Sequence, residues 1–235
     1  MTKMLFRDDP YLRSASATVV ATDAESVTLD QSLFYPQGGG QPGDTGWIQA
    51  ENLKGTVTNS VKGDGDAIRL LVENHGFSVG QTVTQTLDWD RRFAHMRVHS
   101  GLHLLSVVIQ LPVTGGAITA VKGRLDFNMP EALTDKEALQ DQLNALIAQD
   151  LEITESWITD AELEANPGLV KTMSVAPPKG AGHIRLIRIG DDDQQIDLQP
   201  CGGTHVARTS EIGQVTLGKV EKKGAQNRRV NMLLA

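Results

Sequence analysis

Apolar and polar residues alternate through most of the first third of the chain. The alternation runs through SATVVATDAESVTLD, GWIQAENLKGTVTNSV and AIRLLVENHGFSVGQTVTQTLDW, between short Gly, Asp and Asn breaks, and no convincing helix interrupts it. A period of two with such breaks is typical of antiparallel strands in a barrel or a sandwich. Residues 1–90 are therefore predicted to form an N-terminal antiparallel β domain, either a barrel or a sandwich.

The period changes near Asp90, where a second domain, residues 91–235, is predicted to begin. The stretch RRFAHMRVHSGLHLLSVVIQL is apolar at helical spacing and ends at Pro112, so it predicts a largely buried helix. Beyond it the pattern predicts a strand pair in AITAVKGRLDFNM and an amphipathic helix in LTDKEALQDQLNALIAQDL, with Thr134 and Asp135 as N-cap candidates. A strand in LEITESWIT, a short acidic helix near Asp160 and hairpins in HIRLIRIGDDDQQIDLQP and VTLGKVEKKGAQNRRVNMLLA complete an α+β fold.

Four donors suited to a transition metal occur in two widely separated pairs. His99 and His103 stand in HSGLH, and Cys201, the sole cysteine, stands in CGGTH with His205. Residues four apart on a helix share one face, so the first pair can grip an ion from one side and the second can close the other. Imidazoles and a thiolate favour zinc over calcium or magnesium, with iron(II) and nickel as weaker candidates. A lone His pair is more often structural, but a Cys framed by glycines is hard to explain as packing, so one Zn²⁺ per chain is predicted.

The role of His205 stays open at this point. Four protein ligands complete a tetrahedron, so an open position for water requires one ligand to be absent or displaced, or the coordination to expand. If one of the four is unbound, His205 is the candidate, and it would then act as a catalytic base or a substrate contact. Asp197 could orient a ligand imidazole, although a surface charge on a hairpin is the favoured interpretation.

Composition indicates a globular protein of two modest domains. The 235 residues are 40% hydrophobic and 22% charged, no apolar run is long enough to cross a bilayer, and the first residues do not resemble a secretory signal. One cysteine allows no internal disulfide, and a thiolate ligand survives best in a reducing compartment. We therefore expect a cytoplasmic protein without a membrane segment.

Charge is unevenly distributed along the chain. The net charge of −7 argues mildly against a nucleic-acid partner. A basic strip near the C-terminus nevertheless predicts phosphate contacts, and its members are Lys219, Lys222, Lys223, Arg228 and Arg229. A solvated edge strand protected by lysines explains the strip equally well. Arg91 and Arg92 are secondary candidates, with a salt-bridge pair at the domain junction as the equal alternative.

A glycine cluster lies in FYPQGGGQPGDTGW, residues 34–47. Consecutive glycines permit backbone torsions closed to other residues and let a ligand approach closely. The cluster lacks the GK[ST] ending and the following helix of a phosphate loop, so a nucleoside triphosphate site is not expected. By itself the segment favours a wide hairpin turn.

Taken together, FYPQGGGQPGDTG, RVHSGLHLL and QPCGGTHVARTSEIG with KVEKKGAQNRR resemble, in order and spacing, the editing region of alanyl-tRNA synthetase and its free-standing relatives, the AlaX proteins. The resemblance covers residues from about 15 to the C-terminus, and the chain lacks the length and ATP-binding motifs of an aminoacylation domain. It is similar to the medium-length type that carries the glycine-rich first domain. The resemblance implies a β-barrel followed by an α/β editing domain of the type common to threonyl- and alanyl-tRNA synthetases.

The resemblance also implies an activity and a set of site residues. Such proteins hydrolyse tRNA(Ala) mischarged chiefly with serine, and also with glycine, and editing requires no ATP. His99, His103, Cys201 and His205 match the metal-binding positions. Gly38, Gly39, Gly40 and Gln41 match the segment near the substrate, so Gln41 joins His205 as a catalytic candidate. The chain departs from many synthetases at Leu102 and Val121, where they carry Thr and Gln.

Two other functions are weighed against this one. A metallopeptidase is disfavoured because HSGLH lacks the glutamate that HExxH places between its histidines. A non-catalytic module, in which zinc stabilises the domain and the basic strip recruits tRNA or a synthetase, is the alternative. Oligomeric state and tRNA identity elements leave no trace in the sequence.

Overall fold

The computed structural model of the chain describes residues 1–131, 133, 135–171 and 182–235. The chain divides into two compact units, Met1–Ala94 and His95–Ala235, which are described separately. Within these residues no helix combines the length and apolar character needed to span a membrane. The predicted N-cap at Thr134 lies outside the described residues.

The first unit is a curled antiparallel sheet with a short parallel strand pair. The seven-stranded sheet has the order β6-β5-β9-β2-β3-β8-β7, and β1 pairs with β4. Strand β2 lies in the middle of the sheet: its residues up to Thr18 pair with β9, and those from Val19 pair with β3. The elements are β1 Lys3–Met4, α1 Leu5–Asp8, β2 Ser14–Thr22, β3 Ser26–Leu29, β4 Gln31–Ser32, β5 Gly46–Ala50, β6 Leu53–Val57, β7 Asn59–Lys62, β8 Ile68–Leu71 and β9 Thr82–Leu87.

The apolar residues of the alternating pattern point into one hydrophobic core. In β5, for example, Gly46, Ile48 and Ala50 are buried while Trp47 and Gln49 are exposed. The curled sheet encloses apolar side chains from its strands and from the loop after β4, among them Val19, Leu29, Phe34, Ile48 and Leu70. Burying one face of each strand is what fixes the register of the sheet.

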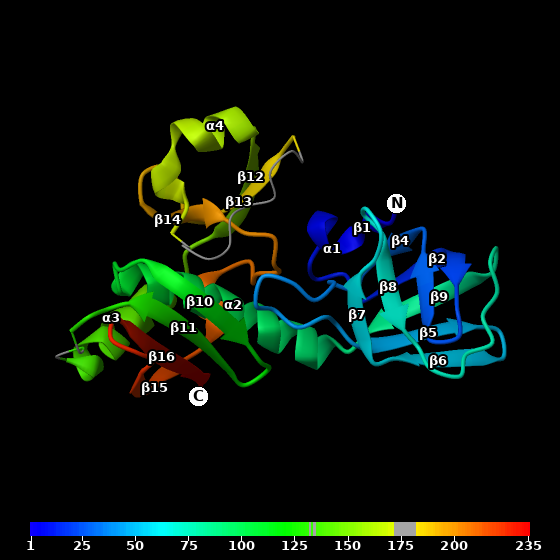
Figure 1. The fold of residues 1–235 in the computed structure, drawn as a ribbon, viewed down its shortest axis with the longest axis horizontal. Coiled ribbons are helices and arrows are strands. Elements are labelled where there is room, and N and C mark those ends of the chain that lie inside the picture. Colours follow the sequence, from blue (N-terminus) through cyan, green and yellow to red (C-terminus); the bar gives the residue numbers. More distant parts are fainter. Residues whose placement is uncertain (132, 134, 172–181) are drawn as a thin grey trace. The chain divides into compact units, whose positions relative to one another are not determined.

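A closed barrel is not confirmed. In residues 1–94, all of which are described, β6 and β7 are the two edges of the sheet and do not pair with one another. Only Thr58 separates them, so a single extended stretch of chain supplies both edges (Figure 1). The predicted strands are present, but their hydrogen bonds form an open, curled sheet.

The second unit combines two antiparallel sheets with helices. The four-stranded sheet has the order β10-β11-β16-β15, and the three-stranded sheet has the order β12-β13-β14 (Figure 1). The unit boundary falls within α2. The elements are α2 Trp89–Val108, β10 Val113–Ile118, β11 Lys122–Asn128, α3 Lys136–Ala148, β12 Ile153–Ile158, α4 Asp160–Ala165, β13 Ile184–Gly190, β14 Gln195–Pro200, β15 Val215–Lys222 and β16 Asn227–Leu234, with 3₁₀ helices η1 Pro167–Leu169 and η2 Thr209–Ile212.

Helix α2 packs closely on the four-stranded sheet. A Cβ on Gly123 would lie 2.6 Å from Val98 Cγ1, and one on Gly101 would lie 2.6 Å from Met232 Cε. Glycine is required at such close approaches because any side chain would displace the neighbouring element. Leu102 also packs at Gly123, so it faces the sheet, whereas Val121 is 67% exposed.

The local predictions for this unit are confirmed. The helix before Pro112, both C-terminal hairpins and the short acidic helix are all present. Asp135 caps α3 by accepting a hydrogen bond from Ala138 N at 2.9 Å. Thr159 and Glu162 form a reciprocal capping box at the start of α4. The chain is thus a mixed α/β protein made mostly of sheet.

Candidate metal centre

The two halves of the predicted ligand set meet in the second unit. The donor atoms of His99, His103, Cys201 and His205 all lie within 4.8 Å of one another. Cys201 Sγ is 3.4 Å from His99 Nε2 and 3.3 Å from His205 Nε2. Helix α2 presents the first two histidines one turn apart, and β14 ends immediately before Cys201. Residues about a hundred positions apart therefore form one cluster.

His103 is held from behind by Asp197. Its Nδ1 lies 3.0 Å from Asp197 Oδ2, and Gln199 Nε2 donates to the same carboxylate oxygen at 2.7 Å. An ionised carboxylate can only accept a hydrogen bond, so the contact with Asp197 places a proton on His103 Nδ1, and the 3.1 Å approach of Gln199 Nε2 to the same nitrogen is then not a hydrogen bond. Nε2 is thereby left to face the cluster. Asp197 is 2% exposed, so its interpretation as a surface charge is wrong.

His205 has a similar support on helix α2. Its Nδ1 lies 3.1 Å from the hydroxyl oxygen of Ser100, which also accepts a hydrogen bond from Val206 N at 3.2 Å. Ser100 is fully buried. A proton on Nδ1 directed at Ser100 leaves Nε2 facing Cys201, as a metal ligand requires.

The cysteine loop is fixed by an arginine on the neighbouring strand. Arg185 NH1 donates to the carbonyls of Cys201 at 3.1 Å and Gly203 at 2.8 Å, and Cys201 N donates to Arg185 O. Glu155 pairs with the same guanidinium. These bonds hold the turn that presents the thiol, so Cys201 Sγ is directed inward from a defined backbone.

The electrostatics favour a thiolate surrounded by imidazoles. Burial alone would raise the pKa of Cys201, but His99 and His205 hold it well below its usual range. Burial would lower the pKa of His103, whereas its hydrogen bond to Asp197 and its contact with Cys201 raise it to about 9. For Asp197, the effect of burial is outweighed by His103 and Lys171, which lower the pKa to about 2. Burial holds the pKa of His205 well below its usual range.

Two separations within the donor set match a tetrahedral cation. Zinc at its usual bond lengths holds its ligands about 3.3 to 3.7 Å apart, and the two sulfur–nitrogen distances of 3.4 and 3.3 Å lie in that range. The supported tautomer of His205 leaves a lone pair facing the cluster, His103 offers Nε2 once a metal displaces its second proton, and a low-pKa thiol supplies the anion. The four residues could therefore hold a metal ion of the zinc class.

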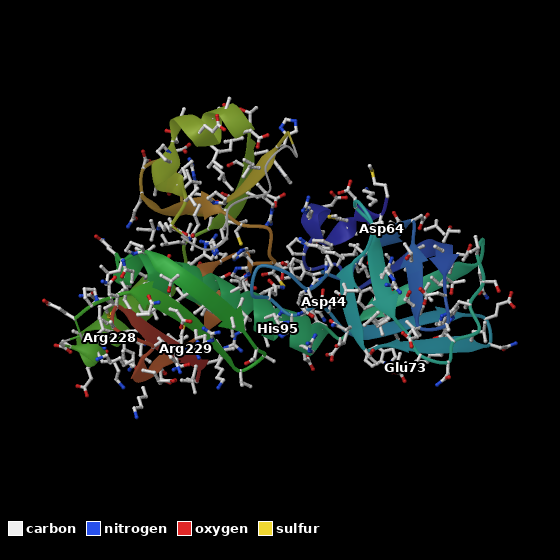
Figure 2. The ribbon with its side chains drawn as sticks, in the orientation of Figure 1. Asp44, Asp64, Glu73, His95, Arg228 and Arg229 are labelled. Atoms are coloured by element: carbon white, nitrogen blue, oxygen red, sulfur yellow. The ribbon has the colours of Figure 1, made fainter. Side chains whose placement is uncertain are left out.

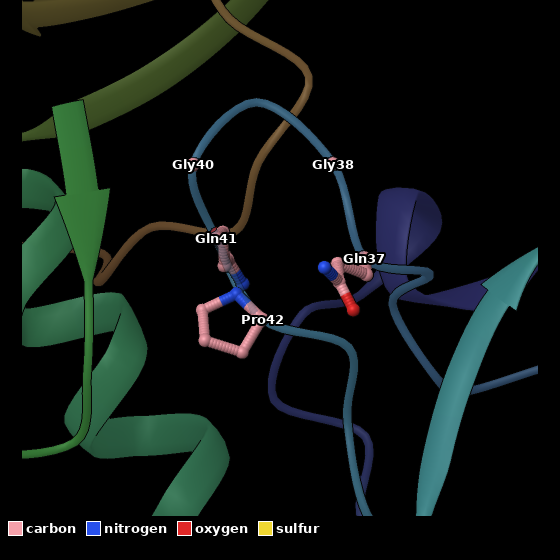
Figure 3. A pocket seen from close by; sticks show the side chains of 5 residues that line it. All are labelled: Gln37, Gly38, Gly40, Gln41 and Pro42. Atoms are coloured by element: carbon pink, nitrogen blue, oxygen red, sulfur yellow. The ribbon is translucent and has the colours of Figure 1, made fainter. Parts of the chain in front are cut away.

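The glycine-rich segment forms a tight turn in the first unit. Gly38 and Gln41 exchange backbone hydrogen bonds of 3.1 and 3.0 Å, and the two intervening glycines have φ of 58° and 82°. Positive φ at both central positions is the mark of a type I′ turn. A pocket of about 340 Å³ is lined by Gln37, Gly38, Gly40, Gln41 and Pro42, with Gly38 and Gly40 on the two limbs of the loop (Figure 3).

Arg91 and Arg92 hold the base of that loop. Arg92 is 1% exposed and donates to Asp44, to Leu33 O at 2.5 Å and to Pro10 O at 3.1 Å. Arg91 NH1 donates to Gly43 O at 2.7 Å. Asp44 also accepts a hydrogen bond from Tyr35 N, which joins the two ends of the loop. The salt-bridge alternative therefore holds for Arg92, within the first unit, and a buried guanidinium cannot bind phosphate.

The basic strip lies on β15, β16 and their connecting turn. Figure 2 labels Arg228 and Arg229, which both lie on β16. Arg229 donates two hydrogen bonds to Asp126, of 2.8 and 3.0 Å, and Arg228 donates to the carbonyls of Pro130 and Glu131. Lys223 pairs with Glu221 at 2.8 Å. Lys219 and Lys222 are exposed on β15. The lysines are thus better placed for an outside partner than the arginines.

Sequence reasoning missed several residues that support the cluster. Ser100 lies inside HSGLH and Gln199 just before Cys201, so the sequence itself places both next to predicted ligands. Lys171, whose Nζ lies 2.5 Å from Asp197 Oδ1, and Arg185 offered no local signal. Both act across strands or loops distant in sequence, which spacing does not reveal.

Comparison with known proteins gives a consistent result. Residues 184–231 match the family described as threonyl and alanyl tRNA synthetase second additional domain, and residues 9–91 match the class II (A) tRNA synthetases. The chain is 34% identical to the alanyl-tRNA editing protein AlaX-M of Saccharolobus solfataricus over 98% of both chains. Identity to AlaX-M of Methanosarcina barkeri is 31%, over 100% of this chain and 99% of that protein. The alanine–tRNA ligase of Pyrococcus abyssi is 32% identical over 94% of this chain, which covers 24% of the ligase.

Proposed function

Because the chain belongs to the AlaX-M family of alanyl-tRNA editing proteins, we propose that it is a trans-editing aminoacyl-tRNA hydrolase. Its substrates are tRNA(Ala) carrying serine and, as a second substrate, glycine. The reaction cleaves the ester between the amino acid and the terminal ribose, and it needs no ATP. The observation that carries this function is the buried cluster of three imidazoles and one thiol.

Zn²⁺ held by His99, His103, Cys201 and His205 is the proposed cofactor. Such an ion, when bound, supplies a Lewis acid for ester hydrolysis. His205 is assigned as a ligand because its Nδ1 contacts Ser100 and its Nε2 lies beside Cys201. The sequence also predicts that an unbound His205 would act as a catalytic base. That role is not needed when His205 is a metal ligand.

Discrimination against alanine requires a polar group near the substrate side chain. Serine differs from alanine by one hydroxyl, and a site built to bind that hydroxyl rejects the analogue lacking it. We assign this contact to the turn of Gly38, Gly39, Gly40 and Gln41. The turn offers backbone groups beside an open pocket, and Gln41 is 1% exposed, with its backbone paired to Gly38. The catalytic assignment of Gln41 stays a prediction.

The first unit is then the substrate-recognition unit and the second is the metal-bearing hydrolytic unit. Residues Lys219, Lys222 and Lys223 contact tRNA phosphates, while Arg228 and Arg229 mainly shape the strip that carries them. A cytoplasmic location follows from a tRNA substrate and a thiolate ligand.

The deciding experiment measures deacylation of Ser-tRNA(Ala), Gly-tRNA(Ala) and Ala-tRNA(Ala) by zinc-loaded wild type and Cys201→Ala. We expect fast hydrolysis of the serine ester, slow or no hydrolysis of the alanine ester, and loss of activity in the variant. No turnover of any ester by folded, zinc-loaded wild type would contradict the hydrolase and favour a non-catalytic zinc-stabilised module that binds tRNA or a synthetase.

A further inference from the structure

The side chain of Lys62, on β7, rests against the glycine turn of the first unit. A Cβ on Gly38 would lie 3.4 Å from Lys62 Cε and 3.7 Å from its Nζ. Gly38 stands on the limb of the loop that follows Gln37, and it lines the pocket of about 340 Å³ (Figure 3). The ammonium group of Lys62 is therefore next to a wall of that pocket.

Hydrogen bonds fix strand β7 against the segment that leads into the turn. Gln37 N donates to Ser60 O at 2.9 Å, and Asn59 Nδ2 donates to Gln37 Oε1 at 3.2 Å. Ser60 is completely buried, and its hydroxyl donates to Tyr35 O at 2.6 Å. The backbone just before Lys62 is thus held in place, while the flexible side chain of the lysine extends to the turn.

The ammonium group of Lys62 is not used within the fold. Of the three lysines of the first unit, Lys3 pairs with Asp8 at 3.0 Å, and Lys54 lies 5.5 Å from the centre of the Trp47 ring. Lys62 is exposed and has no hydrogen bond, ion pair or ring contact with any residue that the structure describes. A solvated cation beside a pocket is therefore available to a ligand.

The tip of the turn also has unused hydrogen-bond donors. Gly39 and Gly40 are exposed, and they donate no backbone hydrogen bond within the described part of the chain. A Cβ on Gly39 would meet no atom within 4 Å, so the tip is open. Successive N–H groups of a turn carry partial positive charge and favour anions. The turn and Lys62 therefore both favour an anionic ligand.

We propose that Lys62 binds the phosphate of the 3′-terminal nucleotide of the tRNA while the glycine turn contacts the amino acid. This inference rests on the proposed function. The amino acid of an aminoacyl ester has no anionic group, because its carboxyl is esterified and its amino group is neutral or cationic, so an ammonium group is not suited to bind it. The phosphate of the terminal nucleotide is attached to the same ribose as the ester, which makes it the nearest anion.

Neutralising that one phosphate tests the contact without any hydrolysis. The affinity of full-length, zinc-loaded protein is measured for uncharged tRNA(Ala) with a methylphosphonate or an ordinary phosphate at its last linkage, both with a 2′-deoxy penultimate nucleotide. We expect the methylphosphonate to weaken binding by about 10-fold for wild type and Lys62→Arg, and by less than about twofold for Lys62→Gln. Lys54→Gln is the matched control and should behave as wild type does, because Lys54 contacts Trp47. Equal losses for wild type and Lys62→Gln overturn the proposal.

Salt dependence and kinetics supply the second readout. Loss of one phosphate contact on a single strand should reduce the slope of log affinity against log salt by about 0.7 in Lys62→Gln. KM for Ser-tRNA(Ala) should rise by about 10-fold, while zinc content and the single-turnover rate at saturation stay within about twofold. A fall in single-turnover rate at unchanged KM contradicts a phosphate contact.

The two sets of results separate this contact from the hydrolase. If the methylphosphonate effect depends on Lys62 but wild type hydrolyses no ester, the hydrolase fails and the phosphate contact stands. If wild type hydrolyses the serine ester but the methylphosphonate effect does not depend on Lys62, the contact fails and the hydrolase stands.

Discussion

At the scale of single residues, the side chains behind the candidate metal ligands decide how those ligands could bind an ion. Asp197 and Ser100 each contact the far nitrogen of an imidazole, at 3.0 and 3.1 Å. Such partners fix the tautomer and the ring orientation, and they commonly change metal affinity by about 10- to 100-fold. Asp197 is itself held by Lys171 and Gln199, so the carboxylate has little freedom to turn away.

Replacing Asp197 by Asn should weaken zinc binding by about 10- to 100-fold, because the amide removes the charge that holds the Nδ1 proton of His103. Competition with a chromophoric chelator measures the affinity. Asp150→Asn is the control, since Asp150 forms an exposed ion pair with Arg208 and should bind zinc as wild type does. Equal affinities for the two variants would remove Asp197 from the metal centre.

At the scale of elements, the first turn of α2 stabilises the loop that carries the three glycines. The Arg92–Asp44 pair has both side chains 1% exposed, and both loop ends meet there. Breaking a buried ion pair leaves an uncompensated charge and commonly costs about 3 to 5 kcal/mol. The turn therefore depends on a residue nearly fifty positions away.

We expect Arg92→Met to lower the free energy of unfolding of the first unit by about 3 to 5 kcal/mol. Arg91→Met removes one hydrogen bond to a carbonyl and should cost about 1 kcal/mol. Urea unfolding followed by the fluorescence of Trp47 and Trp89 compares the two. Adding Asp44→Asn to Arg92→Met should recover part of the loss, because it removes the buried charge. A loss of under about 1 kcal/mol in Arg92→Met would contradict the structural assignment.

The elements themselves were largely predictable. Alternation in β5 and β9 and helical spacing in α2 follow from burying one face of each element, so local sequence carries the signal. Closure of the first sheet was not predictable in this way. Whether β6 pairs with β7 depends on how strands at opposite ends of the sheet meet, and no periodicity within either strand encodes that.

At the scale of the whole molecule, an acidic protein must bind a polyanion through a local surface. The net charge is −7, and the exposed lysines of β15 concentrate positive charge in the second unit. Because counterions are released when phosphates are neutralised, each phosphate contact adds to the salt dependence of binding.

Changing Lys219 and Lys222 together to Glu should weaken tRNA binding and reduce the slope of log affinity against log salt by about one unit per contact. Filter binding at several salt concentrations measures both quantities. Lys54→Glu, on β6 of the first unit, serves as the charge-matched control for one substitution. An unchanged slope in the double variant would exclude this strip from the tRNA surface.

Metal removal distinguishes a hydrolytic from a purely structural site. We expect chelation to abolish deacylation while amide exchange in the first unit stays as slow as in zinc-loaded protein, because the core of that unit contains none of the metal ligands. Global unfolding on chelation would support the structural module. Full activity in metal-free, folded protein would contradict zinc-dependent hydrolysis.

The sequence by itself determined the donor chemistry of the site and most of the elements that carry it. HSGLH and CGGTH contain all four candidate ligands, because residue type and helical spacing are local properties. Only the tertiary structure decided that Asp197 is buried behind His103, that Arg92 closes the glycine turn, and that Arg185 holds the turn of Cys201. Each of these depends on register and packing between distant segments, which are set by the folded core as a whole.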